Sequence, residues 1–546
     1  MIDNKHISKI IIALMAVVVC ICVLAVGFSD RLTEVLGGTG ISMEYETELF
    51  DTDEIITVNI LMDEDEWSEM LSNAMSEEYY VCDVEVNGET FYNVGIRPKG
   101  NTSLSSIAMD PDTDRYSLKL EFDQFEESQT CFGLDKLILN NNYADATNMK
   151  EAIIYDMYQY LGVDASLYNY ATVSVNGEYW GVYLALEAVE DSFLLRNYGT
   201  QNGELYKPES MGIGGGDDDK KSSMPGNMPT PGNMPDFSSG DSDPENMPDF
   251  NSEDFTPGDM PADFNPGEMQ GGPGGGGPSG MGGGGANLNY TDDELDSYST
   301  IWEGAITDTT DADNRRVVTA LKNISEGTDI ETYMDIDNIL KYMAVHTFAV
   351  NDDSLSGTMA HNYYIYENDG MLNIIPWDYN LSWGGMGMGG SSATDVVNDA
   401  IDTPFNSTTF FDALLENEEY LAKYHEYLQM LVDEYVDGGR FEETYNRIRS
   451  QIDELVATDP TAFYNAEEYD AAADTLYEVV TLRAESIKGQ LDGTIPSTDD
   501  GQKEDSSSLI NADGIDVSVM GQMNMGDGGD GDRVGVKENK RNKKVQ

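Results

Sequence analysis

A stretch rich in Met, Pro, Gly and Asp interrupts an otherwise patterned chain between residues 208 and 290. It repeats Met-Pro and Pro-Asp-Phe units and ends in the glycine-rich sequence GGPGGGGPSGMGGGG. Such a composition buries too little apolar surface to offset the entropy of ordering the backbone, so we expect disorder. Its sequence holds neither the Gly-Lys-Ser/Thr ending of a phosphate loop nor nine-residue calcium repeats. The fold must therefore come from two patterned segments, 45–207 and 291–495.

The first segment alternates apolar and polar residues, as half-buried strands do. Asn87-Gly88 and Asn176-Gly177 are hairpin turn signals. One helical period covers 145–162, with Gly162 as its C-cap. An antiparallel sheet with one packed helix is predicted. The predicted strands are 56–62, 79–88, 90–100, 115–122, 136–141, 170–177 and 179–187.

The second segment is mostly helical and contains one hairpin. Apolar residues recur at helical spacing in each of its predicted helices. Residues 496–546 are polar and Gly-rich and end in KENKRNKKVQ, so we expect a solvated, disordered tail. The predicted helices are 335–350, 408–415, 419–436, 439–457 and 466–491.

Residues 10–28 form an apolar run of 19 residues without a charge, long enough to span a bilayer. Lys5 and Lys9 precede it, which predicts a cytoplasmic segment 1–9 and an extracytoplasmic remainder. A cleaved signal peptide is the alternative. The length of the run and the lack of a small-x-small cleavage site favour an uncleaved anchor in the cell membrane.

The net charge of -71 argues against nucleic acid and anionic lipid as partners. It suits divalent cations or basic proteins. Cys82 and Cys131 lie in the exported part, where a disulfide or two buried thiols fit the sequence equally well.

Acidic residues and an asparagine frame the predicted hairpin within 351–384. Asp352 and Asp353 precede its first strand, Asn362 opens that strand, and Asp378 follows the second. This order is typical of phosphoryl-transfer sites, which position a hydroxyl nucleophile and Mg²⁺. Ordinary turns also use these residue types, so a hairpin without chemistry is the alternative.

A strand-rich part followed by a helical part with this hairpin is the two-lobed order of protein kinases. Lys119 on a strand and Glu151 on the single helix are then candidates for a phosphate-binding ion pair, or else surface residues. Other candidate nucleotide contacts are Arg97 and Lys99 in RPKGNTS, Glu187 at a strand end and Lys207 in ELYK.

Seven blocks in order resemble the CotH kinase family, atypical protein kinases first associated with bacterial spore coats. The resemblance covers residues 50–495 apart from the insertion. The blocks are FYNVGIRPKGNTS, RYSLKLEF, LILNNNYADATNMKEAIIYDMYQYLGV, NGEYWGVYLALEAVEDSFL, GELYK, AVNDDSLSGTMAHNYYIY and IIPWDYNLSWGG.

The resemblance implies an α+β, two-lobed protein-kinase-like fold behind the N-terminal transmembrane helix. It implies transfer of phosphate from ATP, with Mg²⁺ or Mn²⁺, to Ser or Thr of secreted or surface coat-type proteins. Asp353 resembles the catalytic-loop Asp, with Asp352 as the alternative. Asn362 and Asp378 resemble the metal-binding residues. A basic, Ser-rich protein substrate would complement the negative charge.

Three features depart from the pattern. Asn362 lies nine positions after Asp353, against five in ordinary kinases. Asn380 stands where the family has a second acid, and no GxGxxG loop is present in the sequence, so RPKGN would serve the phosphates. A non-catalytic coat scaffold and transfer of a nucleotidyl group therefore remain as alternative functions.

Overall fold

The computed structural model describes residues 41–208, 283–386 and 392–523. The predicted anchor at 10–28 lies outside these residues, as does most of the 208–290 insertion. Among the described residues, no helix combines the length and apolarity that a membrane span requires. Cys82 and Cys131 are both buried, unbonded thiols.

The N-terminal region is rich in strands, as its alternating sequence predicts. Its helices and strands are α3 (Tyr45–Glu48), β1 (Ile56–Leu61), α4 (Glu64–Ser72), η1 (Ala74–Ser76), β2 (Tyr80–Val86), β3 (Glu89–Lys99), α5 (Thr102–Met109), β4 (Ser117–Glu121), β5 (Lys136–Asn140), α6 (Lys150–Leu161), β6 (Tyr168–Val175), β7 (Glu178–Glu187), α7 (Asp191–Tyr198) and β8 (Glu204–Tyr206).

Seven of these strands close into a barrel in the order β1-β2-β3-β4-β5-β7-β6. Its pairs are antiparallel except β1 with β6. Leu118 and Leu120 of β4 belong to the barrel's core, so the intervening Lys119 faces outward. Arg97 pairs with Lys119 in register, and Lys99 pairs with Ser117. The outer face of β3 and β4 therefore carries three cations.

The C-terminal region is mostly helical. Its helices and strands are η3 (Gly283–Gly285), η4 (Leu295–Tyr298), α8 (Ser299–Glu303), α9 (Asp311–Ser325), α10 (Ile330–Tyr333), α11 (Ile336–Ala349), β9 (Tyr363–Asn368), β10 (Met371–Pro376), α12 (Ala393–Asn398), α13 (Asp412–Leu415), α14 (Glu418–Met430), the π-helix η5 (Leu431–Val436), α15 (Arg440–Thr458), α16 (Ala466–Asp492), α17 (Asp499–Glu504) and η6 (Val517–Met520).

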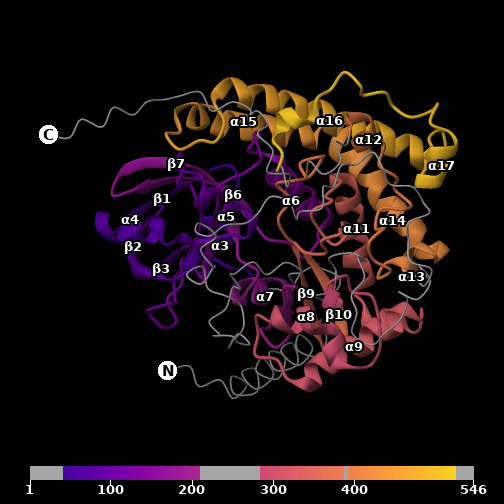
Figure 1. The fold of residues 1–546 in the computed structure, drawn as a ribbon, viewed down its shortest axis with the longest axis horizontal. Coiled ribbons are helices and arrows are strands. Elements are labelled where there is room, and N and C mark those ends of the chain that lie inside the picture. Colours follow the sequence, from indigo (N-terminus) through magenta and orange to yellow (C-terminus); the bar gives the residue numbers. More distant parts are fainter. Residues whose placement is uncertain (1–40, 209–282, 387–391, 524–546) are drawn as a thin grey trace, which may run out of the picture. The chain divides into compact units, whose positions relative to one another are not determined.

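The predicted hairpin forms β9 and β10, and β8 pairs with β9 to complete a three-stranded sheet. Helix α11 packs against β10, and α15 and α16 run side by side (Figure 1). Helix α6 is buried on nearly every side because it contacts β6, α11 and α15. One hydrophobic core joins α6 to the helical region.

The structure differs from the predicted boundaries at several places. Helix α6 begins at Lys150 rather than 145, because Asp145 accepts hydrogen bonds from Thr147 in a local turn and Asn148 is left-handed (φ 51°). The predicted helix 408–415 is reduced to α13, since Asn289 accepts hydrogen bonds from Thr409.

Part of each segment predicted to be disordered is ordered in the structure. Residues 283–290 are placed, and Ala286 and Leu288 belong to the buried residues. The predicted tail forms α17 and η6, and η6 packs on α16 with Val517 and Met520 buried. Buried apolar side chains and hydrogen bonds to the rest of the fold dock this polar segment.

Candidate active site

Asp353 lies in the loop between α11 and β9, where its side chain is buried and hydrogen-bonded. His361 Nε2 lies 2.7 Å from its Oδ1. Asn362 Nδ2 donates to the Asp353 carbonyl at 2.7 Å and to Oδ2 at 3.1 Å. Asn362 reaches both groups from a left-handed backbone conformation (φ 58°), which asparagine tolerates better than most residues. The loop therefore presents a fixed carboxylate.

Asp378 follows β10 directly and also has a left-handed backbone (φ 60°). Such a conformation costs about 1–3 kcal/mol and is concentrated at functional sites. Its Oδ1 is buried and has no hydrogen-bond partner among the residues that the structure describes. Burial raises the pKa of Asp378, and the Asp353 carboxylate raises it further, against the opposing effects of Lys99, Lys207 and His361. This carboxylate lacks a sufficient counter-charge.

Glu151 lies in the first turn of α6 and is 2% exposed. Its carboxylate accepts a 2.7 Å hydrogen bond from Asn140 Nδ2, and the backbone N–H of Tyr379 lies 3.5 Å away. Burial raises its pKa, and Asp378 adds to this effect, whereas Lys99 lowers the pKa. The ammonium group of Lys99 thus acts on Glu151 and Asp378 together.

The two cations of the site come from strand ends. Lys99 is the last residue of β3, and its Nζ lies 5.5 Å from the centre of the Trp377 ring. Lys207 follows β8, with Nζ 5.7 Å from the Tyr364 ring centre. We call Lys99, Glu151, Lys207, Asp353 and Asp378 the central cluster. The structure thus brings five of the sequence-predicted site residues together, and Asn362 bonds to one of them.

Lys119 does not pair with Glu151, contrary to the predicted ion pair. Its Nζ lies 2.9 Å from Glu190 and 3.8 Å from Glu121, and Lys136 also pairs with both glutamates. We call Lys119, Glu121, Lys136 and Glu190 the barrel cluster. Alternation along β4 predicted the outward face of Lys119 correctly, but it could not predict which acids lie opposite.

Arg97 and Glu187 are also held by other partners. Arg97 forms an ion pair with Glu77, and its guanidinium lies 5.3 Å from the Tyr79 ring centre. Glu187 is fully buried, where it accepts hydrogen bonds from Arg196 and, at 2.6 Å, from the Tyr45 hydroxyl. These contacts give Glu187 a structural role at the end of β7.

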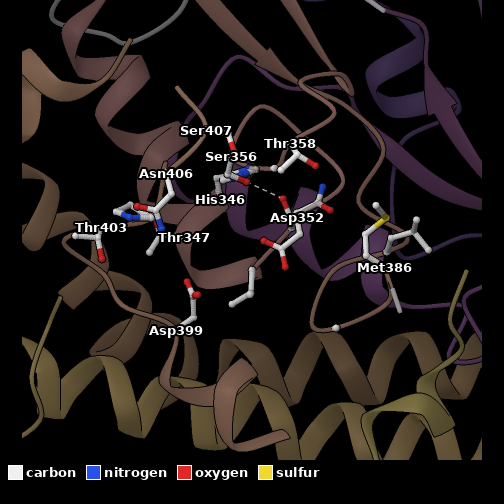
Figure 2. Close-up of a pocket in the computed structure, with 16 residues that line it drawn as sticks. His346, Thr347, Asp352, Ser356, Thr358, Met386, Asp399, Thr403, Asn406 and Ser407 are labelled. Atoms are coloured by element: carbon white, nitrogen blue, oxygen red, sulfur yellow. Dashed lines mark hydrogen bonds between the residues drawn. The ribbon is translucent and has the colours of Figure 1, made fainter. Parts of the chain in front are cut away.

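Asp352, the alternative to Asp353, faces a different space. It lines a pocket of about 300 Å³ together with Ser356, Thr358 and Asp399, whereas Asp353 is not among the lining residues (Figure 2). Burial raises the pKa of Asp399 to about 7, with an added effect of Asp352, although Arg483 opposes the shift. Residues of the loop that carries Asp353 thus line this acidic pocket.

Sequence reasoning missed three asparagine and histidine residues that position the carboxylates. His361 bonds Asp353, and Asn140 bonds Glu151. Asn351 Nδ2 donates to the Asp378 carbonyl at 3.2 Å, and its Oδ1 accepts from the Asp353 N–H at 3.3 Å. Their adjacency to Asn362, to the end of β5 and to Asp352 was a signal, but the distances depend on how the loops fold.

The family model for the CotH kinase protein matches residues 96–257 and 281–487. The chain belongs to the CotH kinase family. Inner spore coat protein H of Bacillus subtilis (strain 168) is 25% identical over 166 residues, which cover 30% of this chain. The chain matches only 43% of the length of that curated relative. The resemblance inferred from the seven sequence blocks is therefore confirmed at the level of the family.

The oxygen atoms of the site are donors of the kind that a divalent cation would take. No group of three or more His, Cys, Asp or Glu side chains with metal-binding geometry occurs in the described ranges. Mg²⁺, however, commonly uses one or two carboxylates and takes its remaining ligands from water and phosphate. The unpartnered Asp378 Oδ1 and the Asn362 side chain supply donors of the kind that Mg²⁺ prefers.

Asn380 replaces the second acid of the CotH motif and has a structural contact of its own. Its Nδ2 donates a 2.8 Å hydrogen bond to the carbonyl of Tyr143, in the segment that leads to α6. A carboxylate at this position could not donate that bond. The amide therefore ties the loop after Asp378 to the N-terminal region.

Proposed function

We propose that this chain is an extracytoplasmic, membrane-anchored protein kinase that transfers the γ-phosphate of ATP to Ser or Thr of secreted or coat-type proteins. The observation that carries the proposal is the central cluster, where two lysines meet three carboxylates, one with an unpartnered oxygen. Membership of the CotH kinase family supports it. The anchor rests on the apolar run at residues 10–28.

In this proposal, Asp353 orients the acceptor hydroxyl and accepts its proton, because its carboxylate is fixed by His361 and Asn362. Asp378 and Asn362 hold Mg²⁺, which when bound neutralises charge on the phosphates. Lys99 and Lys207 bind phosphate oxygens. Glu151 sets the position of Lys99. Catalysis then comes chiefly from positioning and electrostatic stabilisation.

The acidic pocket supplies a feature for choosing the protein substrate. Asp352 and Asp399 line it, beside the loop that carries Asp353. A basic side chain next to the acceptor residue would add a positive charge beside these carboxyl groups, which fits a basic, Ser-rich substrate. Asp399→Asn should then raise KM for a basic Ser-rich protein several-fold and leave KM for ATP unchanged. An unchanged KM for the protein would contradict this assignment.

The alternative is a coat scaffold without turnover. The observation that favours it is Asn380, which removes one carboxylate from the metal side and uses the position for a structural hydrogen bond. A scaffold with an inert site would show no ATP-dependent stabilisation, whereas ligand binding raises the melting temperature by mass action.

The proposal is tested with the full-length chain, a basic Ser-rich acceptor protein, Mg²⁺ and ATP labelled at either the γ or the α phosphate. We expect label to reach Ser or Thr only from the γ-labelled ATP, and Asp378→Ala to abolish transfer while the protein stays folded. Transfer from the α-labelled ATP would identify a nucleotidyl transferase instead. Undiminished transfer by Asp378→Ala would contradict the site assignment.

A further inference from the structure

A buried histidine connects the two loops that carry Asp353 and Asp378. His346 lies on α11 and is 2% exposed. Its Nδ1 lies 2.9 Å from the hydroxyl of Tyr379, the residue after Asp378. Its Nε2 lies 2.8 Å from the hydroxyl of Ser356, three residues after Asp353. Both ring nitrogens are therefore engaged, one by each loop.

The donor and acceptor of each hydrogen bond around His346 can be deduced. Ser356 donates its single hydroxyl proton to the carbonyl of Asn351 at 2.8 Å, so its oxygen must accept from Nε2–H of His346. The bare Nδ1 then accepts from the Tyr379 hydroxyl. The oxygen of Tyr379 is in turn left to accept from the hydroxyl of Tyr158 on α6. One tautomer of a neutral imidazole satisfies all the groups.

The hydrogen bonds around His346 lead to the candidate site at both ends. Asn351, whose carbonyl receives the Ser356 proton, donates its own amide to the Asp378 carbonyl and accepts from the Asp353 N–H. At the other end, the backbone N–H of Tyr379 lies near Glu151. His346 thus completes a ring of hydrogen bonds that contains both loops. We call Asn351, Ser356, His346 and Tyr379 the histidine network.

The histidine network holds the two loops together without adding charge to the site. The Asp353 carboxylate adds to the effect of burial on the pKa of Asp378, so the two side chains lie close enough to repel one another, and repulsion tends to separate the loops that carry them. A cationic tether would compete with Lys99 and Lys207 for these carboxylates. Dipoles in a buried setting hold the loops strongly without adding charge, because the low local dielectric strengthens satisfied hydrogen bonds.

We propose that His346 is a positioning residue that fixes the spacing of Asp353 and Asp378 through Ser356 and Tyr379. The inference rests on the proposed kinase function. His346 borders the acidic pocket (Figure 2), but its ring nitrogens are occupied by the two hydroxyls, so it acts through the loops and not on the substrate. A misplacement of about 1 Å at a reacting centre lowers the rate about 100-fold.

The test measures kcat and KM for ATP with the full-length chain, the basic Ser-rich acceptor protein, Mg²⁺ and γ-labelled ATP. His346→Phe keeps a planar ring and removes both hydrogen bonds. We expect it to lower kcat about 100-fold and to change KM for ATP less than about twofold. Tyr424→Phe is the matched control, because the buried hydroxyl of Tyr424 bonds Thr347 and Ile401, which lie outside the histidine network. It should lower the melting temperature and leave kcat unchanged.

A double-mutant cycle separates positioning from general loss of stability. Tyr379→Phe and Ser356→Ala remove the two partners of His346 on opposite loops, and both are conservative changes. We expect their effects on kcat to be non-additive with His346 present and additive in the His346→Phe background. Because Tyr379→Phe and Ser356→Ala keep the side-chain packing, their additivity with His346 present decides the matter even if His346→Phe fails to fold.

The outcomes distinguish the two proposals. A wild-type chain without γ-phosphate transfer contradicts the proposed function and with it this inference. An active wild type with additive effects of Tyr379→Phe and Ser356→Ala, or a folded His346→Phe with wild-type kcat, overturns the role of His346 alone.

Discussion

The central cluster and the barrel cluster each place one lysine from the outer face of β3 or β4 beside carboxylates, but their ion pairs differ. In the barrel cluster, Lys119 and Lys136 each pair with Glu121 and Glu190, two cations for two acids. In the central cluster, Lys99 and Lys207 face three carboxylates, and one oxygen of Asp378 has no partner among the described residues. Among the described residues, the central cluster therefore holds more carboxyl groups than lysines.

We propose that the barrel cluster is a structural network and that the central cluster is a binding site. Paired and hydrogen-bonded charges hold a barrel face together, and they have no need of a ligand. Burial raises the pKa of Asp378 and Glu151, a neighbouring carboxylate raises each further, and a divalent cation would offset both effects. Residue type alone does not distinguish the clusters, since each contains Lys and Glu.

The largest expected effect comes from replacing one lysine in each cluster by methionine. Lys99→Met should lower kcat/KM for ATP at least about 100-fold, because it removes a charge next to the phosphates. Lys119→Met should change it less than about threefold and instead lower the melting temperature, since it breaks partly buried ion pairs. Steady-state phosphotransfer and thermal unfolding measure both. Equal kinetic effects would end the distinction between the clusters.

The histidine network differs from both clusters, because its buried polar groups carry no charge. Burial lowers the pKa of His346 to about 3, below its unfolded value, so the unfolded state takes up a proton first as the pH falls. Stability is lost as the pH falls below about 6.5. The stability advantage of wild type over His346→Phe should therefore shrink by about 2 kcal/mol between pH 7 and pH 5. Urea unfolding measures it, and a constant difference would show that His346 ionises freely.

His361 tests whether the central cluster depends on its hydrogen-bond donors as well as on its charges. His361→Phe removes the bond to Asp353 and should lower kcat about tenfold, in line with the loss of a hydrogen bond to a charged group. His361→Gln keeps a donor and should recover most of the rate. If the two variants have the same rate, the bond to Asp353 has no kinetic role.

Asn380 tests whether the charge of the central cluster can be raised further. Asn380→Asp adds the missing family carboxylate and loses the bond to Tyr143, which costs about 1 kcal/mol. We expect the Mg²⁺ concentration for half-maximal rate to fall a few-fold while the melting temperature also falls. A Mg²⁺ titration of the rate measures the first effect, and no change there would place residue 380 outside the metal site.

The sequence predicted the elements well and the partners of charged residues poorly. Strict alternation in 115–122 and helical spacing in 335–350 predict a strand and a helix, and β4 and α11 lie where expected, although both faces of β4 are buried. Motif position also brought Asp353, Asn362 and Asp378 into one candidate site. The partner of Glu151 instead depends on which strand end meets α6, a consequence of barrel closure that no local pattern contains. The same limit applies to Glu187, whose partner Arg196 comes from the following helix.

The docking of the tail follows a related rule. Residues 496–523 are polar overall, which predicted disorder, but their position is decided by single apolar side chains such as Met520 and by backbone bonds. The Ala146 N–H donates to the Met520 carbonyl, and Met523 donates to Gly385. Average composition does not detect contacts of this kind.

The most direct test of the central claim, that the central cluster is a Mg²⁺-ATP site, is calorimetric titration of ATP with and without Mg²⁺. It needs no protein substrate. We predict that Mg²⁺ strengthens ATP binding to the wild-type chain at least about tenfold and that Asp378→Asn abolishes this gain, because the carboxylate that holds the cation is lost. Mg²⁺-independent binding to the wild type, or an equal gain in Asp378→Asn, would contradict the account.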